Sequence, residues 1–294
     1  MKPNYSQTAI DYEKGMQYLD RLGISRLEAE RNLKGLERLV IKIGGDCLNG
    51  NNTNLIEHIA VLNQLGIYPV VTHGGQTQIN VLMERYGIQI ERIGQQRVTD
   101  KRTLDLCVIP ALRQVNEQLV GAIIDKGGRT VTLADHEIIY VTQLNKALGY
   151  VGQPVGINSQ PIVKLLEMKC SPVLWCIGYD QYHQAYNVNG DRIPQPIIKA
   201  IGAQKLISVT KEGGVFGSDG STLIPTIGLS KIDCLIEGGI VKKGMIEKLQ
   251  QAEKVLRDQS LGLADDFKVQ LIRPDQLLTE LATNKGAGTE IVKD

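Results

Sequence analysis

The chain has 294 residues, of which 42% are hydrophobic, and its 33 basic and 32 acidic residues leave a formal net charge of +1. The length suffices for a substantial core, and the balanced charge gives no sign of a nucleic-acid or membrane partner, which would call for a field of one sign. Five scattered cysteines without a CxxC pair, and the lack of an apolar leader or a membrane-length apolar stretch, predict a soluble protein of the cytoplasm.

Residues 5–34 carry apolar side chains at helical spacing, with charged residues between them. This spacing is typical of an amphipathic helix. We therefore expect a helical extension, residues 1–35, that packs either on its own domain or on a partner subunit.

From Arg38 onward, strand-like segments alternate with helical segments. This alternation predicts an α/β fold in three layers, with a central, mostly parallel sheet covered by helices on both faces. The long helical segment 102–127 contains Pro110, which should kink it. The predicted strands are residues 38–43, 67–72, 128–135, 171–177, 204–210 and 267–273, with a hairpin region at 150–158. The predicted helices are residues 53–66, 77–87, 102–127, 159–168, 242–258 and 274–286.

Two glycine pairs follow predicted strands. Gly44 and Gly45 come after the first strand, Gly74 and Gly75 come after the second, and each pair precedes a helix or turn. Ligands of open α/β sheets bind at the carboxyl ends of strands, and backbone N–H groups at such turns favour an anion. The alternative is a tight turn that uses glycine for steric reasons alone.

Lys42 stands between Ile41 and Ile43 in the first predicted strand, so we expect its ammonium to be buried. A buried ammonium is costly unless it is paired, and a phosphoryl group at the glycine turns would supply the pair. The alternative is a lysine at a strand edge whose ammonium reaches solvent.

The stretch "YNVNGD", residues 186–191, would direct Asn187, Asn189 and Asp191 to one side of an extended chain and suits a polar ligand. The alternative is an Asx-rich turn that caps the next helix. Arg97 could bind a carboxylate with its fork of N–H groups or stand exposed. The sequence contains no Walker loop, dinucleotide fingerprint, zinc motif or GxSxG.

The strings "VIKIGG", "PVVTHGG", "RVTD", "YNVNGD" and "GMIEK" occur in an order and at separations that resemble the acetylglutamate kinases of the amino acid kinase family. The resemblance covers residues 36–292 and is closest, through "LIRPDQLLTELATNKGAGTEIV", to the kinase module of fused N-acetylglutamate synthase/kinases. It implies the amino acid kinase fold over residues 36–294, with an acyl-amino-acid-binding lobe (36–200) and a nucleotide-binding lobe (201–294). The implied reaction is ATP-dependent phosphorylation of the side-chain carboxylate of N-acetyl-L-glutamate in arginine biosynthesis. Mg²⁺ would be held mainly by the nucleotide phosphates, with no metal site in the protein.

The resemblance also implies roles for individual residues. Lys42 would hold the transferring phosphoryl oxygens, Lys248 would neutralise charge on the leaving side, and Asp191 would orient both lysines. Backbone N–H groups would come from Gly44, Gly45, Gly74 and Gly75, and the nucleotide would lie near Lys211, Gly213 and Gly214. The substrate would be bound by Arg97, Asn187 and Asn189. A homo-oligomer is implied, and an arginine effector could bind at Glu280, Gly286 and Gly288.

Several positions around the implied site depart from the family pattern, and they are Asp46, Gln76, Gly190, Arg192 and Glu247. Two alternatives to an acetylglutamate kinase therefore stay open. One is a related kinase that acts on another acidic amino acid or a derivative of one. The other is a catalytically weak, arginine-binding regulatory subunit.

Overall fold

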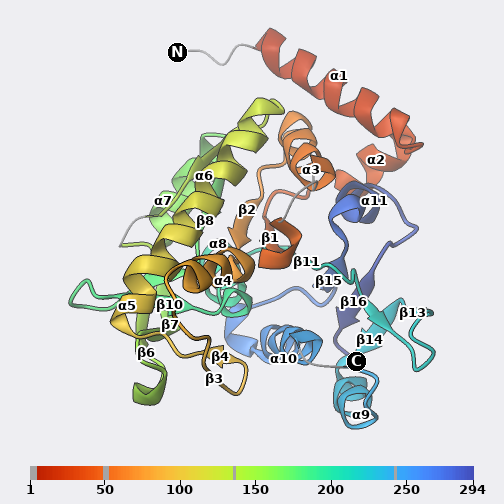
Figure 1. Cartoon of the computed structure of the whole chain (residues 1–294). Coiled ribbons are helices and arrows are strands. Elements are labelled where there is room, and N and C mark those ends of the chain that lie inside the picture. The colour runs from red at the N-terminus through yellow and green to blue at the C-terminus, as the bar shows by residue number, and fades with distance from the viewer. Residues whose placement is uncertain (1–4, 49–52, 135–136, 242–243) are drawn as a thin grey trace.

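The computed structural model describes residues 5–48, 53–134, 137–241 and 244–294. An eight-stranded sheet forms its centre, in the order β14-β16-β15-β11-β1-β2-β8-β5 (Figure 1). Neighbouring strands from β15 to β5 are parallel, whereas β16 is antiparallel to β15. The predicted α/β fold with a mostly parallel sheet is confirmed. The strands are β1 (Leu39–Ile43), β2 (Val70–His73), β5 (Thr130–Thr132), β8 (Ser171–Leu174), β11 (Lys205–Val209), β14 (Thr226–Gly228), β15 (Val269–Ile272) and β16 (Thr289–Val292).

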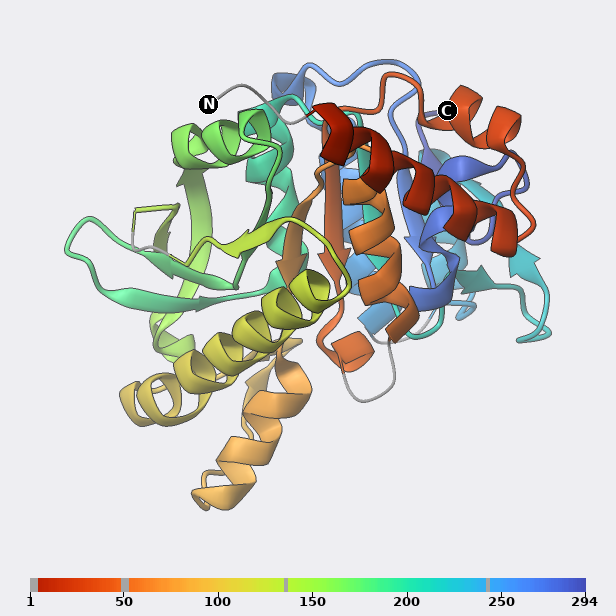
Figure 2. The same cartoon turned by 90° about the horizontal axis from the view of Figure 1, so that it is seen from above.

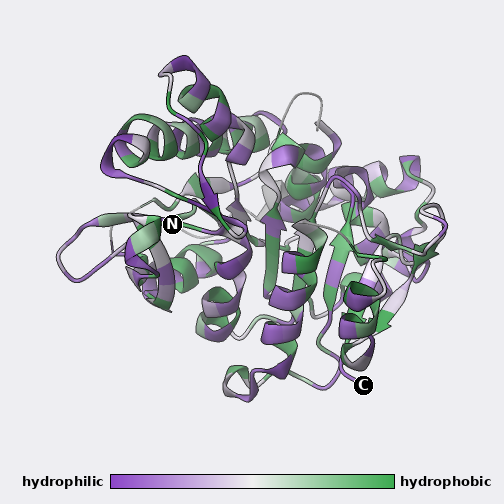
Figure 3. Cartoon of the chain, turned by 60° about the horizontal axis from the view of Figure 1, so that its bottom comes forward, coloured by the Kyte–Doolittle hydropathy of each residue, from purple (hydrophilic) through white to green (hydrophobic). Residues whose placement is uncertain are grey.

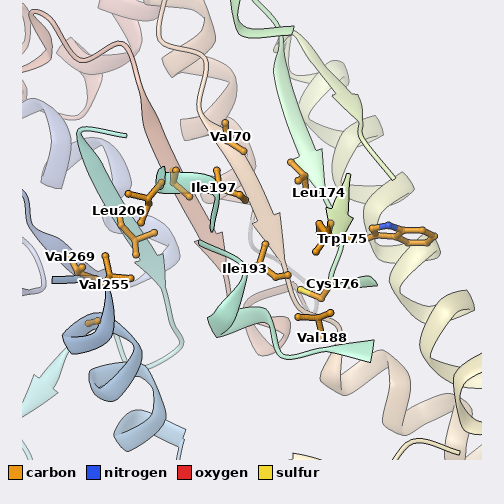
Figure 4. Close-up of a cluster of buried hydrophobic side chains, with 14 of the residues drawn as sticks. Val70, Leu174, Trp175, Cys176, Val188, Ile193, Ile197, Leu206, Val255 and Val269 are labelled. Atoms are coloured by element: carbon orange, nitrogen blue, oxygen red, sulfur yellow. The ribbon is translucent and has the colours of Figure 1, made fainter. Parts of the chain in front are cut away.

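Helices cover both faces of this sheet. One cluster of buried apolar side chains lies under α1 (Tyr5–Arg21), α2 (Arg26–Leu33), α3 (Thr53–Gln64) and α11 (Leu277–Ala282). A second cluster lies under α4 (Gln76–Arg85), α8 (Pro194–Ile201) and α10 (Gly244–Arg257), and part of it is drawn in Figure 4. In β1, Val40 belongs to the second cluster and Ile41 to the first, because side chains alternate across a strand. Lys42 therefore points to the face that carries α8 and α10. Helices α7 (Ser159–Glu167) and α9 (Ile232–Glu237) lie elsewhere in the chain.

A smaller closed sheet stands beside the central one, in the order β10-β7-β6-β9. The predicted hairpin region 150–158 forms a single strand, β7 (Val151–Ile157), which pairs antiparallel with β6 (Ile139–Gln143). The other strands of this smaller sheet are β9 (Ile177–Tyr179) and β10 (Ala185–Val188). Two further hairpins are formed by β3 (Arg92–Ile93) with β4 (Gln96–Arg97) and by β12 (Val215–Phe216) with β13 (Leu223–Ile224).

The predicted long helix around Pro110 is present in three consecutive pieces. They are α5 (Lys101–Thr103), a π-helical turn (Leu104–Val108) and α6 (Ile109–Asp125), with Pro110 in the first turn of α6. Proline has no N–H to donate to the preceding turn. In place of a simple kink, the helix contains a wider π-helical turn just before Pro110, and the helix continues through it.

The N-terminal extension packs on its own chain. Met16 and Leu19 of α1 are 2% and 0% exposed, and Gly15 faces Leu65, which follows α3. Figure 2 shows α1 lying across α3 when the molecule is seen from above. This is the first of the two arrangements that the sequence left open.

The surface helices carry hydrophilic and hydrophobic residues in alternate bands (Figure 3). This banding fits helices with one buried face. Among the described residues, no helix combines the length and the apolar character that crossing a bilayer requires. The first two residues of the predicted helix 242–258, and the end of the predicted strand 128–135, lie outside the described residues.

Candidate active site

Lys42 lies in the middle of the central sheet. Its side chain is on β1, opposite Thr72 of β2 and Ser208 of β11, and the residue is 5% exposed. The ammonium forms an ion pair and hydrogen bond with the carboxylate of Asp191. Burial disfavours the charged amine, but the charge and hydrogen bond of Asp191 outweigh burial and raise the pKa of Lys42. Lys42 is therefore a buried, fully charged cation.

Asp191 lies in a short 3-10 turn, Gly190–Arg192, that follows β10. Burial raises the pKa of Asp191, whereas the charges of Lys42 and then Lys248 lower it, and the net shift is downward. The strand ends at Val188, so the predicted alternation does not extend to Asp191. Instead, Asn189 caps the turn, with its Oδ1 accepting a hydrogen bond from the backbone N–H of Asp191 at 2.9 Å. The carboxylate thus reaches Lys42 because of a capped turn.

Lys248 approaches the same carboxylate from α10. Its Nζ donates one hydrogen bond, to the backbone carbonyl of Gly244 in the same helix, at 3.4 Å. Its charge acts on Asp191, since it is one of the causes that lower the pKa of that carboxyl. Two cationic side chains from different elements therefore share one acid.

The two glycine turns pack backbone to backbone. A Cβ added to Gly45 would lie 2.7 Å from the amide nitrogen of Gln76 and 2.8 Å from that of Gly75. The amides of Gly44 and Gly74 donate to Val209 and Ile43 at 2.9 and 3.0 Å. The expectation that all four glycines offer N–H groups therefore needs correction, because these two amides continue the sheet. Among the backbone hydrogen bonds that the described residues form outside helices and strands, none is donated by the amide of Gly45 or Gly75.

Arg97 is a buried guanidinium without a carboxylate partner among the described residues. It is 7% exposed and donates to the Sδ of Met83 at 2.9 Å and to the Oδ1 of Asn80. Burial, together with the nearby charge of Arg92, lowers the pKa of Arg97 to about 10. Because an unpaired buried cation is costly, this arrangement favours an anionic ligand.

These side chains surround one cavity of about 700 Å³. The cationic residues that line it are Lys42, Arg92, Arg97 and Lys248, and the acidic ones are Asp46, Asp191 and Glu247. The predicted site residues that line it are Lys42, Gly44, Gly45, Gly74, Gly75, Arg97, Asn187, Asn189, Asp191 and Lys248. The amide of Asn187 also donates to the Oγ1 of Thr99 at 3.2 Å. The cavity therefore carries the positive charge and the polar groups that a phosphorylated or carboxylated ligand needs.

Three predicted nucleotide-binding residues, Lys211, Gly213 and Gly214, are not among the residues that line this cavity. Lys211 is exposed, and Gly213 has a φ of +79° and lies against Arg273. A Cβ on Gly214 would lie 2.5 Å from Leu223. Both glycines thus have steric reasons for their place in the loop after β11.

The predicted effector residues lie apart from the cavity, at α11 and the turn before β16. Glu280 is 6% exposed, and its carboxylate accepts hydrogen bonds from the side chain of Gln270 and from the backbone N–H of Ala287 at 2.6 Å. Gly286 has a φ of +59°, and a Cβ on Gly288 would lie 1.8 Å from the carbonyl oxygen of Leu271. The fold alone therefore requires glycine at positions 286 and 288, without any effector.

The sequence reasoning missed the contacts of Glu247 and Gln96. It noted Glu247 only as a departure from a family pattern, yet this carboxylate accepts hydrogen bonds from Asn189 and from Gln96 of the β3–β4 hairpin. No local signal indicated these contacts, because a glutamate on an amphipathic helix is ordinarily exposed to solvent.

A model described as the amino acid kinase family matches residues 37–262. The acetylglutamate kinase of Methanococcus aeolicus is 32% identical over 88% of this chain and 92% of its own length. The acetylglutamate kinase of Synechocystis sp. is 33% identical over 86% of this chain and 87% of its own length. Among solved structures, the protein smu.665 from Streptococcus mutans UA159 matches with a TM-score of 0.75 and 27% identity, covering 88% of this chain and 99% of its own.

Proposed function

This chain belongs to the amino acid kinase family, and we propose that it transfers the γ-phosphoryl group of ATP to the side-chain carboxylate of N-acetyl-L-glutamate. The product is N-acetyl-L-glutamyl 5-phosphate, and the reaction belongs to arginine biosynthesis. The similarity to acetylglutamate kinases over most of the chain supports this assignment. The chain is therefore a phosphotransferase with a carboxyl group as acceptor.

The observation that carries the proposal is the buried Lys42–Asp191 pair beside two glycine turns, with Lys248 in the same cavity and its charge acting on the acid. A buried ion pair has a large desolvation cost, so it is a poor way to stabilise a fold. It is a good way to keep a cation charged in a dry site until an anionic group arrives. Phosphoryl transfer between two anions needs such a cation.

The chemistry assigned to this chain is positioning and charge neutralisation. A glutamate side chain has a pKa of about 4.3, so at neutral pH the acceptor is already a nucleophile and needs no general base. Lys42 stabilises the phosphoryl group in transfer, Lys248 stabilises the leaving side, and Asp191 pairs with Lys42 and lies in the field of Lys248. Arg97 and Asn187 bind the α-carboxylate of the acceptor.

We infer that Mg²⁺ reaches the site on the triphosphate. Among the described residues, no three His, Cys, Asp or Glu side chains converge as a metal-binding group, and Asp46 brings one carboxylate to the first glycine turn. Mg²⁺ is commonly held by one or two carboxylates plus substrate phosphates, so the residues present fit an ion of this kind. When bound, the ion neutralises charge on the phosphates.

The experiment that tests the function is a comparison of acceptors. ADP release with Mg-ATP is measured across N-acetyl-L-glutamate, L-glutamate, L-aspartate and N-acetyl-aminoadipate, with Lys42→Ala as the inactive control. Turnover fastest on N-acetyl-L-glutamate is the expected result. Loss of turnover in Lys42→Ala should be at least about 100-fold, since Lys42 acts on charge that develops in the transition state.

A second function, phosphorylation of another acidic amino acid or derivative, is favoured by the polar wall of the cavity. Gln95, Gln96 and Glu247 line the side formed by the hairpin and α10. The methyl group of an acetyl substituent gains little binding free energy when its neighbours are amides and a carboxylate, because little apolar surface is buried. Faster turnover of an unacetylated acid in the same assay would favour this second function over the first.

Effector binding and assembly stay predictions. We propose that the protein is a homo-oligomer. We also propose that arginine binds near Glu280, because the buried carboxylate of Glu280 lies next to the backbone turn at Ala287. If no acceptor turns over but arginine raises the melting temperature, the chain would be an arginine-binding regulatory subunit. The cytoplasmic location is likewise a prediction.

A further inference from the structure

Glu247 joins three segments of the chain at one oxygen atom. It lies in the first turn of α10, and its Oε1 accepts hydrogen bonds from the Nδ2 of Asn189 at 2.5 Å and from the Nε2 of Gln96 at 3.1 Å. The donors are 58 and 151 residues away in the sequence. Asn189 directly follows β10 and Gln96 lies in the β3–β4 hairpin, and Figure 1 shows this hairpin at the same end of the molecule as α10.

Both polar atoms of the Asn189 side chain have a partner inside the protein. Its Oδ1 accepts from the backbone N–H of Asp191, and its Nδ2 donates to Glu247. Asn189 therefore has the double task of capping the turn that carries Asp191 and holding α10 against that turn. Asn189 also lines the cavity, so its expected role as a substrate-binding residue stays a prediction.

Lys248 follows Glu247 in the same helical turn. Its ammonium is not joined to Asp191 by any ion pair described in the structure, and its hydrogen bond goes to Gly244 of its own helix. The position of this charge is thus set by where α10 lies. Glu247 and Lys248 are consecutive residues of α10, and the hydrogen bond from Asn189 to Glu247 joins this turn of α10 to the segment that carries Asp191.

We propose that Glu247 is a positioning residue for phosphoryl transfer, an inference that rests on the kinase function proposed above. Its carboxylate holds α10, and with it Lys248, in register with the turn that carries Asp191. The same carboxylate holds the β3–β4 hairpin against α10 at the edge of the cavity. Glu247 acts through Lys248 and Asn189 and need not touch the reacting atoms.

Two substitutions separate hydrogen bonding from charge. In Glu247→Gln the side-chain amide oxygen can still accept from both donors, whereas Glu247→Ala removes the acceptor. A matched control is Glu253→Ala, which removes a glutamate from the same helix whose partner, Arg257, lies on that helix too. Gln96→Ala removes the hairpin donor alone and leaves the α10 residues unchanged.

The first measurement is hydrogen exchange of the full-length protein, which does not depend on turnover. Exchange of backbone amides in β3–β4 and in residues 189–192 should accelerate by about tenfold in Glu247→Ala and stay within about twofold of wild type in Glu247→Gln and Glu253→Ala. Gln96→Ala should accelerate exchange in the hairpin alone. If the exchange rates of both segments in Glu247→Ala equal those of the wild type, the proposal is overturned.

The second measurement is steady-state kinetics with Mg-ATP. Glu247→Ala should lower kcat by about tenfold with less than about a twofold change in KM for ATP, and Glu247→Gln should restore kcat to within about threefold of wild type. Equal loss in both variants would overturn the proposal, because the charge and not the shared acceptor would then matter. Wild-type turnover on N-acetyl-L-glutamate reports on the proposed function by itself, so failure of that function is seen separately from failure of this inference.

Discussion

Replacing Asp191 by Asn should destabilise the fold more than replacing Lys42 by Met. The first change leaves a 5% exposed ammonium without its counter-charge. The second leaves a carboxylate that still lies in the field of Lys248, whose charge lowers the pKa of Asp191. The charge of Asp46 also favours the ammonium of Lys42, but it is the weakest cause that acts on Lys42, whereas Lys248 is the strongest influence on Asp191 after burial and the charge of Lys42, so the pair is asymmetric.

The size of the effect follows from burial. Removing one member of a buried ion pair costs about 3–5 kcal/mol, and water from the adjacent cavity of about 700 Å³ places Asp191→Asn near the lower end, at about 3 kcal/mol. Lys42→Met leaves a carboxylate with one hydrogen bond fewer and should cost about 1–2 kcal/mol. The double variant Lys42→Met/Asp191→Leu should lie within about 1 kcal/mol of wild type, because apolar residues can replace a buried pair.

The dependence on pH has a definite sign. In the wild type the pKa of Asp191 is below 3.8 and that of Lys42 is above 10.5, so the contribution of the pair is constant between these limits. It is lost as pH falls through the folded pKa of Asp191. In Asp191→Asn, burial should hold the pKa of Lys42 below 10.5, so the unfolded state binds more protons and stability should rise with pH below that value.

The assay is urea unfolding at pH 7 and pH 9, followed by the fluorescence of Trp175. This residue is the single tryptophan of the chain and is 4% exposed, so unfolding changes its surroundings. Linear extrapolation gives the free energy of unfolding of each variant. Equal losses in the two single variants, or a double variant that loses their sum, would refute the reasoning.

Three further changes have expected outcomes. Arg97→Gln should raise KM for the acceptor by about 10- to 100-fold with little effect on KM for ATP, because a charge-assisted hydrogen bond is lost; steady-state kinetics with Arg113→Gln as an exposed control checks this, and equal effects on both substrates would contradict it. Gly45→Ala should lower kcat by about tenfold, because its Cβ would lie 2.7 Å from the amide nitrogen of Gln76; unchanged kcat would show that the turns can separate freely. The free energy of unfolding should fall as pH drops from 6.5 to 4, since His58 and His73 each have a pKa of about 4 in the folded protein. In urea titrations His58→Leu should reduce this slope by up to about 1.4 kcal/mol per pH unit, and an unchanged slope would argue against a neutral, buried His58.

The burial of Lys42 and the two glycine turns could be predicted from local sequence. Apolar neighbours on both sides of a lysine indicate a strand covered on both faces, and β1 is buried at every position. The counter-ion could be predicted only through resemblance, since Asp191 lies 149 residues further along the chain. The carboxylate of Asp191 reaches Lys42 from a capped turn and not from an extended strand, and the position of this turn depends on where β10 ends.

The partners of Glu247 could not be predicted by any local pattern. Hydrogen bonds across 58 and 151 residues depend on how α10, β10 and the hairpin are placed by the whole sheet. The same limit applies to Gly214, whose need for glycine arises from Leu223 and Thr289. Sequence periodicity predicts the elements, whereas contacts between side chains of distant elements require the three-dimensional arrangement.

The position of β14 at the end of the central sheet has a consequence for how the protein is made. Residues 226–228 hydrogen-bond to residues 290–292 of β16. During translation, at about 5–20 residues per second, this strand therefore waits on the order of 3 to 13 seconds for its neighbour to be synthesised. Until then its polar backbone is open to chaperones and to nascent chains on nearby ribosomes.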